Sequence, residues 1–137
     1  MATSPEAYVD TSAFIAFMDG SDTHHPLFAR LFATPPRLVT TSLVIAEGHG
    51  WFLRRFDRTR ALSFLAMVEM LAPLVVVPVA AKEIAAATKL MRRFSDQDLT
   101  LADAVGLHLM GVRKTRRCWS TDRHLRLTGI PLVIDQA

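Results

Sequence analysis

Short runs of apolar and β-branched residues alternate with longer stretches of helical spacing along this chain. Such an alternation requires crossover connections, which join parallel strands and place helices on both faces of the sheet. The clearest extended run, residues 74–77, consists of one leucine and three valines between Pro73 and Pro78. We interpret this run as a strand that is buried on both faces. The predicted fold class is α/β, a three-layer α/β/α sandwich with a mostly parallel central sheet.

Turn and cap residues divide the chain into the elements that we expect. Ser42 is a candidate N-cap for a helix that extends to about residue 56. We expect strands at residues 7–9, 37–40, 74–77, 116–120 and 131–134. We expect helices at residues 12–18, 25–33, 42–56, 61–71, 80–93, 100–112 and 121–125.

Length and composition exclude several classes of protein. A chain of 137 residues without a repeat or linker predicts a single domain over residues 1–137. The longest apolar run, residues 71–81, contains two prolines and is shorter than the roughly 20 residues of a membrane-spanning helix. The first residues lack the features of a signal peptide, so we expect a cytoplasmic protein without a membrane partner. The single cysteine, Cys118, excludes a disulfide framework and a cysteine-based zinc site.

Four acidic residues that lie far apart in the sequence are expected at one edge of the sheet. Two of them, Asp10 and Asp122, follow predicted strands, and the other two, Glu47 and Asp103, lie early in helices that follow strands or turns. The carboxyl ends of parallel strands meet at one rim, so these side chains should converge there. Converging carboxylates repel one another unless a cation neutralises them, and Mg²⁺ or Mn²⁺ prefers such oxygen ligands. The predicted chemistry is hydrolysis of a phosphodiester bond by water.

Each acid also has a purely structural interpretation. Thr100 and Asp103 have the spacing of a capping box, so Asp103 could serve only the N-terminus of its helix. Asp122 could stabilise the dipole of a short helix that follows it. The structural interpretation is weakest for Glu47, because it sits among apolar and small residues, where a free carboxylate is costly to bury. The grouping of all four acids favours a metal site over four separate structural roles.

Arginine dominates the basic residues of the chain. All but three of its 16 basic residues are arginines, and many of them lie in clusters at residues 54–60, 92–93 and 113–117. The planar guanidinium suits phosphate, so a polyanionic partner is plausible. Solvated helix faces explain the same clusters, and the charge alone does not decide between the two interpretations.

At four ordered segments the chain resembles the PIN-domain family, and most closely its VapC-type toxin ribonucleases from toxin–antitoxin pairs. The matching segments are residues 8–12, 41–47, 98–104 and 120–124. Their order and spacing fit the family over nearly the whole chain. The sequence departs from the family pattern at Leu125, where an aromatic residue is frequent, and this difference concerns packing more than chemistry.

The resemblance implies an endoribonuclease that depends on Mg²⁺, with Mn²⁺ as a substitute. The catalytic residues that it implies are Asp10, Glu47, Asp103 and Asp122, with Asp10, Asp103 and Asp122 as metal ligands. It assigns auxiliary roles to Ser12, Ser120 and Asp98. The partners that it implies are an RNA substrate, a cognate antitoxin and a second copy of the chain in a homodimer.

Several other residues have side chains that could belong to the site. None of the five histidines has the spacing of a zinc ligand pair on one helix face, and we assign all of them structural or surface roles. Trp51 and Arg54 lie on the same helix face as Glu47. We expect Trp51 to serve packing, and Arg54 to contact RNA or the antitoxin. The helical spacing does not say what Gly48 and Gly50 approach.

Two other classes of function remain open on the sequence alone. One is a different Mg²⁺-dependent phosphohydrolase on a similar sheet, but the Asp-x-Asp pattern of an aspartate nucleophile is absent from residues 10–12. The other is a non-catalytic PIN-like module that binds RNA or a protein partner. RNA cleavage that depends on the acids distinguishes the nuclease from both.

Overall fold

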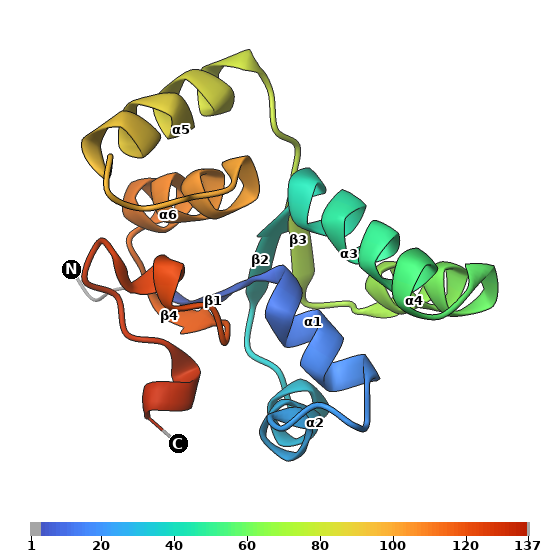
Figure 1. Cartoon of the computed structure of the whole chain (residues 1–137). Coiled ribbons are helices and arrows are strands. Elements are labelled where there is room, and N and C mark those ends of the chain that lie inside the picture. Colours follow the sequence, from blue (N-terminus) through green and yellow to red (C-terminus); the bar gives the residue numbers. More distant parts are fainter. Residues whose placement is uncertain (1–3, 137) are drawn as a thin grey trace.

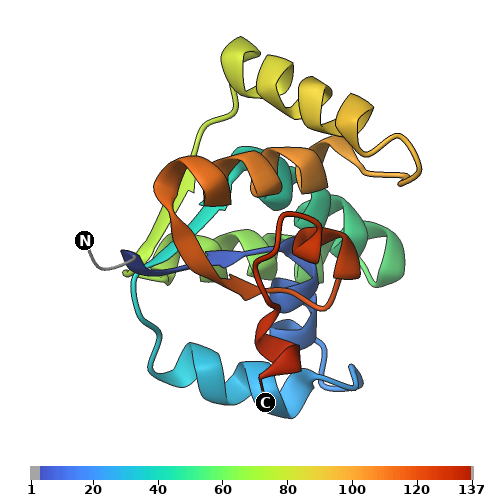
Figure 2. The same cartoon turned by 90° about the vertical axis from the view of Figure 1, so that its left-hand side faces the viewer.

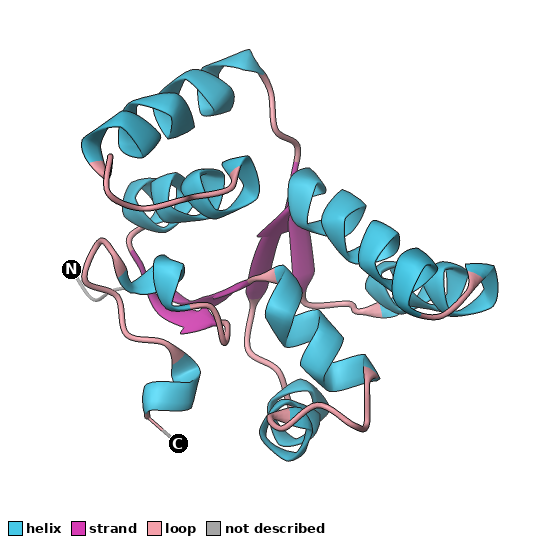
Figure 3. Ribbon diagram, viewed as in Figure 1, coloured by secondary structure: helices cyan, strands magenta, loops and turns pink. Residues whose placement is uncertain are grey.

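A computed structural model describes residues 4–136, and four parallel strands form its central sheet (Figures 1 and 3). The strand order is β3-β2-β1-β4, so the first strand in the sequence lies inside the sheet. The pairs β1–β2, β1–β4 and β2–β3 are all parallel. The strands are β1 (Ser4–Val9), β2 (Leu38–Thr41), β3 (Leu74–Val77) and β4 (Thr115–Trp119). The predicted parallel sheet is confirmed.

Helices connect successive strands and cover both faces of the sheet (Figure 2). The α-helices are α1 (Thr11–Met18), α2 (His25–Ala33), α3 (Ser42–Arg55), α4 (Arg58–Met70), α5 (Ala81–Arg93) and α6 (Leu101–Arg113). Two short 3₁₀ helices follow β4, namely η1 (Arg123–Arg126) and η2 (Val133–Asp135). Within residues 4–136, no helix is both long and apolar enough to cross a membrane.

The alternation of side chains along β1 builds a separate apolar core on each face of the sheet. Ala7 and Val9 point to the face where α1, α2, α3 and α4 pack. Tyr8 points to the opposite face and packs with α6 residues that include Met110. Helix α5 lies outside α6 and buries Ala87 against it. The predicted three-layer α/β/α arrangement is confirmed, with α5 stacked on one of its helical layers.

The expectation that residues 74–77 are buried on both faces is wrong. Strand β3 lies at the edge of the sheet, where Val75 is 51% exposed and Val76 is 39% exposed. Residues 6–9 of β1 and all residues of β2 are buried, because these two strands lie inside the sheet, whereas the other edge strand, β4, is buried at Thr115, Cys118 and Trp119 and exposed at the two residues between Thr115 and Cys118. A run of β-branched residues suits any pleated surface and does not distinguish an edge strand from a central one.

The chain after β4 and the start of α3 also differ from the predicted elements. Residues 131–134 do not form a strand: Leu132 makes one parallel bridge to Cys118, and the chain then turns into η2. The Asp135 carboxylate accepts a hydrogen bond from the Leu132 backbone N–H, which favours that turn over a longer strand. The N-cap of α3 is Thr41, whose hydroxyl accepts a hydrogen bond from the Val44 N–H at 3.2 Å.

Candidate active site at the carboxyl edge of the sheet

Asp10 is a buried carboxylate at the end of β1, the strand that lies between β2 and β4. Its side chain is held by two serine hydroxyls: Ser12 Oγ donates to Asp10 Oδ2 at 3.0 Å, and Ser120 Oγ donates to the same oxygen at 2.9 Å. Ser12 comes from α1 and Ser120 from the end of β4, so two segments 108 residues apart fix one carboxylate. The structure therefore presents Asp10 in a defined orientation at the rim of the sheet.

Hydrogen bonds to the same serines also position the loop that carries Asp122. Ser120 Oγ accepts from the Asp122 N–H at 2.9 Å, and Ser12 Oγ accepts from the Thr121 N–H at 2.9 Å. The Asp122 carboxylate remains partly exposed beside Asp10. One small hydroxyl network thus organises the first and the last of the predicted acids.

Asp103 caps the N-terminus of α6 and also lines the cavity that contains the other predicted acids. Its backbone N–H donates to Thr100 Oγ1 at 3.1 Å, and its Oδ2 lies 3.4 Å from the Thr100 backbone nitrogen, so the capping box is present. The same side chain is only 7% exposed and lines a cavity at the rim of the sheet. The capping interaction fixes the carboxylate in place at the N-terminus of α6 without removing it from the cavity.

Glu47 reaches the same cavity from the second turn of α3. Glu47 is exposed, contrary to the expectation that its carboxylate is buried at a cost. It lies with its neighbour Ala46 on the solvent side of α3. Its Oε1 accepts a hydrogen bond from Thr11 Oγ1, which ties it to the start of α1. The apolar run around Glu47 packs against the core through other positions, such as Val44.

The structure brings all four predicted acids into one cavity of about 220 Å³. The residues that line this acidic pocket are Asp10, Thr11, Ser12, Ile15, Glu47, Trp51, Arg54, Thr100, Asp103 and Asp122. Arg54 lies on its wall, as the helical spacing suggested, and so does Trp51, which also contacts Phe52 with ring centroids 5.0 Å apart. Asp98 is exposed and is not among the residues that line the pocket.

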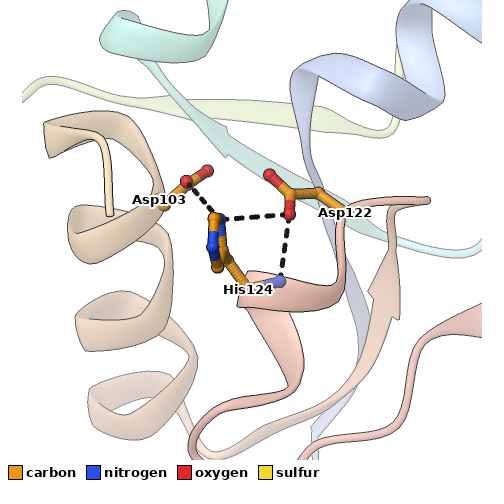
Figure 4. A group of neighbouring side chains, drawn as sticks. All are labelled: Asp103, Asp122 and His124. Carbon is orange, nitrogen blue, oxygen red and sulfur yellow. Dashed lines mark hydrogen bonds and ion pairs between the residues drawn. The ribbon is translucent and has the colours of Figure 1, made fainter. Parts of the chain in front are cut away.

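His124 is a residue of the site that the sequence reasoning missed. Its Nδ1 lies 3.5 Å from Asp103 Oδ2 and 3.4 Å from Asp122 Oδ1, and its ring points between the two carboxylates (Figure 4). Its backbone N–H also donates to Asp122 Oδ1 at 3.0 Å. The spacing of histidine pairs on one helix does not indicate it, because its partners are acids: Asp122, two residues earlier in the chain, and Asp103 on α6. The spacing Asp122-x-His124 directly after a strand was the available signal.

The electrostatics of the pocket favour a bound cation. Burial raises the pKa of Asp10 to about 6; the Ser120 hydrogen bond opposes this shift, and the charge of Asp103 adds to it. Burial also raises the pKa of Asp103, and the charge of Asp122 raises it further. The buried Glu6 at the start of β1 shows the opposite case, since a bidentate contact with Arg113 lowers its pKa. Carboxylates whose ionised forms are disfavoured in this way are neutralised well by a divalent ion.

The side chains present fit such an ion. One ligand atom from each of Asp103, Asp122 and His124 lies within 4.8 Å of the others, in the part of the chain that the structure describes. This set adds a histidine nitrogen to two of the predicted ligands, and the third predicted ligand, Asp10, lines the same pocket. Two carboxylates and an imidazole suit Mn²⁺ as well as Mg²⁺, because Mn²⁺ accepts nitrogen ligands more readily than Mg²⁺ does.

The raised pKa of Asp10 predicts that the metal-free protein loses stability as the pH rises. The folded state holds a proton on Asp10 up to a pH of about 6, whereas an unfolded Asp, with a pKa near 3.9, releases its proton about two pH units earlier. Between about pH 5 and about pH 7.5 the folded state gives up this proton, and the free energy of unfolding should therefore fall by about 1 kcal/mol. Urea denaturation at the two pH values measures the difference. Saturating Mn²⁺ should remove this difference in the free energy of unfolding. The same pH dependence in the Asp10→Asn variant would contradict its assignment to Asp10.

Comparisons with known proteins agree with this architecture. The family model of the PIN domain matches residues 7–130. No curated protein matches the chain. Among solved structures, VapC20 of Mycobacterium tuberculosis, described as a sarcin–ricin loop cleaving toxin, is similar with a TM-score of 0.84 and 22% identity, covering 91% of this chain and 96% of that one.

Two further solved structures are similar to this chain over most of its length. VapBC2 of Rickettsia felis, solved with a fragment of its promoter DNA, has a TM-score of 0.65 and 14% identity, covering 93% of this chain and 96% of that one. A toxin–antitoxin complex of Klebsiella pneumoniae has a TM-score of 0.61 and 16% identity, covering 92% and 94%. At these identities the structural likeness shows the fold, and the family follows from the model match over residues 7–130. The chain belongs to the PIN domain family.

Proposed function

We propose that this protein is a metal-dependent endoribonuclease that hydrolyses RNA phosphodiester bonds, and that it is the toxin of a toxin–antitoxin pair. The observation that carries the proposal is the convergence of Asp10, Glu47, Asp103 and Asp122 on one pocket. Membership of the PIN domain family supports nuclease chemistry, and the likeness to VapC20, described as a sarcin–ricin loop cleaving toxin, supports the toxin role.

The side chains of the pocket divide the work of hydrolysis among them. We assign the metal to Asp103, Asp122 and His124, with Asp10 as the neighbouring carboxylate that completes the negative site. When bound, Mg²⁺ or Mn²⁺ would supply activation of water and compensation of charge on the phosphate.

The remaining residues position the reactants. Glu47 is exposed at the pocket, so its carboxylate can accept a proton from the attacking water, and the Thr11 hydroxyl holds it in place. Ser12 and Ser120 keep Asp10 oriented through their hydroxyls. Arg54, on the pocket wall, can bind a phosphate oxygen of the RNA through its planar guanidinium.

Cleavage of a mixed pool of tRNA, rRNA and mRNA tests the proposal. The purified protein should cut RNA with Mg²⁺ or Mn²⁺ and should stop when EDTA is added. Asp103→Asn should lower the rate at least about a hundredfold, because it removes a metal ligand while keeping the size of the side chain. The matched control is Asp96→Asn, an exposed acid outside the pocket, which should cut at the wild-type rate.

Two outcomes would contradict the nuclease. Cleavage that survives Asp103→Asn would place the active site elsewhere. Binding of RNA without cleavage, across several metals and substrates, would favour a non-catalytic module. We also propose a homodimer and a cognate antitoxin, which light scattering and co-purification from the native cell test separately.

A further inference from the structure

A second pocket lies directly beside the acidic one. Its volume is about 390 Å³, within the range of small-molecule sites in proteins. The residues that line it are Gln97, Arg123, His124, Arg126 and Leu127. Gln97 belongs to the connection between α5 and α6, and the other four belong to η1 and the residue that follows it. We call it the η1 pocket.

His124 connects the two pockets. Its Nδ1 faces Asp103 and Asp122 at 3.5 and 3.4 Å, and its side chain also lines the η1 pocket. Asp122 lines the acidic pocket and the next residue, Arg123, lines the η1 pocket, so the boundary between them falls within one turn of chain. Figure 4 shows the ring of His124 beside Asp103 and Asp122. A polymer bound at the acids therefore has a neighbouring unit within reach of the η1 pocket.

The charge of the wall changes sign across this boundary. Arg123 and Arg126 are both exposed and supply guanidinium groups, which bind phosphate through paired N–H donors. Arg126 also approaches Asp135, but at 3.4 and 3.5 Å these contacts are long, and at the surface they contribute little that would hold the side chain. Both arginines can therefore turn toward a ligand.

The rest of the wall suits a nucleobase. The Gln97 amide offers a donor and an acceptor, the two groups needed to bind the edge of a base. Leu127 supplies an apolar surface for the face of a base. Single-stranded RNA is recognised in this manner, by contacts to the faces and edges of unstacked bases together with the phosphate.

We propose that the η1 pocket binds the nucleotide adjacent to the scissile phosphate and selects its base. Arg123 and Arg126 hold the phosphate of this nucleotide, and Gln97 contacts the edge of its base. This inference rests on the proposed ribonuclease function and adds the residues that determine the cleavage sequence. It makes Gln97 a specificity residue and leaves the hydrolysis to the acidic pocket.

The base contact is tested by sequencing the ends of a random-sequence RNA pool after cleavage. Wild-type protein should prefer one or two bases at a position next to the cut. In Gln97→Ala this preference should weaken by about tenfold, while preferences at other positions stay the same, because one pair of hydrogen bonds is lost. A purely structural role of Gln97 would lower the overall rate and leave the base pattern unchanged. That result, or a wild-type pattern without preference beside the cut, would overturn the base contact.

The phosphate contact is tested by steady-state kinetics on one RNA taken from the sequenced products. Arg123→Gln should raise KM about tenfold with little change in kcat, because the arginine binds the substrate equally before and during reaction. Arg116→Gln, the same loss of charge on the exposed side of β4, is the matched control and should leave KM within about twofold. An equal rise in KM in the two variants would mean that Arg123 only attracts RNA through its charge, and would overturn the proposed phosphate contact in the η1 pocket.

The two proposals fail in different ways. If the wild-type protein cuts no RNA with either metal, the proposed ribonuclease function is wrong, and so is the proposed role of the η1 pocket. If it cuts RNA while the Gln97 and Arg123 variants behave as the wild type, only the η1 pocket fails. Thermal unfolding of each variant should show a cooperative transition of a folded protein, because the substituted positions are exposed or half-buried.

Discussion

Asp10→Asn is expected to abolish RNA cleavage and to make the metal-free protein more stable. The rate should fall at least about a hundredfold, because the pocket loses its most buried negative charge and binds a divalent ion less well. At about pH 7.5 the free energy of unfolding should rise by about 2 kcal/mol, because burial raises the pKa of Asp10 to about 6 and the ionised form destabilises the fold. The asparagine oxygen can still accept the hydrogen bonds from Ser12 and Ser120.

Cleavage assays and urea denaturation, each with and without Mn²⁺, measure the two effects. The expected gain in stability should be present without metal and should shrink or reverse with saturating Mn²⁺, because only the wild type gains from the ion. Asp96→Asn is again the control and should change neither quantity. A variant that loses both activity and stability would mean that Asp10 serves the fold, and that its charge is already compensated in the metal-free protein.

The positions of the acids could be predicted because they follow from topology. Asp10 and Asp122 come after strands that pair in parallel, and parallel strands present their carboxyl ends at one rim. The position of Asp103 at the same rim follows because it lies at the start of a helix that leads back to the sheet. These inferences need only the order of strands and helices, which the apolar pattern predicts well.

The exposure of β3 and the role of His124 depend on the tertiary structure and could not be predicted from the local sequence. The edge position of β3 depends on which strands pair, and local composition does not contain that choice. The role of His124 depends on the direction of its ring relative to Asp122, on the same turn of the chain, and to Asp103, on α6. Side-chain direction is set by tertiary packing, so spacing along the chain could suggest a place near the site but not a partner.

The two glycines of α3 show that close packing between helices also cannot be predicted from spacing along the chain. Helix propensity assigns the same cost to Gly48 and Gly50, and the sequence could not distinguish them. In the structure, a Cβ at Gly50 would meet the end of the flexible Arg54 side chain at 2.9 Å, which can move aside. A Cβ at Gly48 would meet the ring of Phe64 from α4 at 2.6 and 2.8 Å. Gly48 is therefore the position where α3 and α4 require the absence of a side chain.

Gly48→Ala is accordingly expected to destabilise the protein by about 2 kcal/mol, although alanine is the better helix former by about 1 kcal/mol. Phe64 cannot yield easily, because it is fully buried and stacks on Phe52 with ring centroids 5.4 Å apart. Urea denaturation monitored by circular dichroism measures the loss. Gly111→Ala is the matched control: its Cβ would meet no atom within 4 Å, so the same substitution in α6 should stabilise by up to about 1 kcal/mol.

A second substitution separates the clash from other causes. Phe64→Leu removes the ring atoms that the new Cβ would meet, so the double variant should lose less stability than the sum of the two single variants. Strict additivity would mean that α3 and α4 move apart at little cost and that the close approach at Gly48 is incidental.

The coupled result matters for the site as well, because the α3–α4 packing fixes the helix from which Glu47, Trp51 and Arg54 reach the acidic pocket. A separation of the two helices would move one wall of that pocket relative to Asp10, and Gly48→Ala should then reduce cleavage even at temperatures where the variant remains folded.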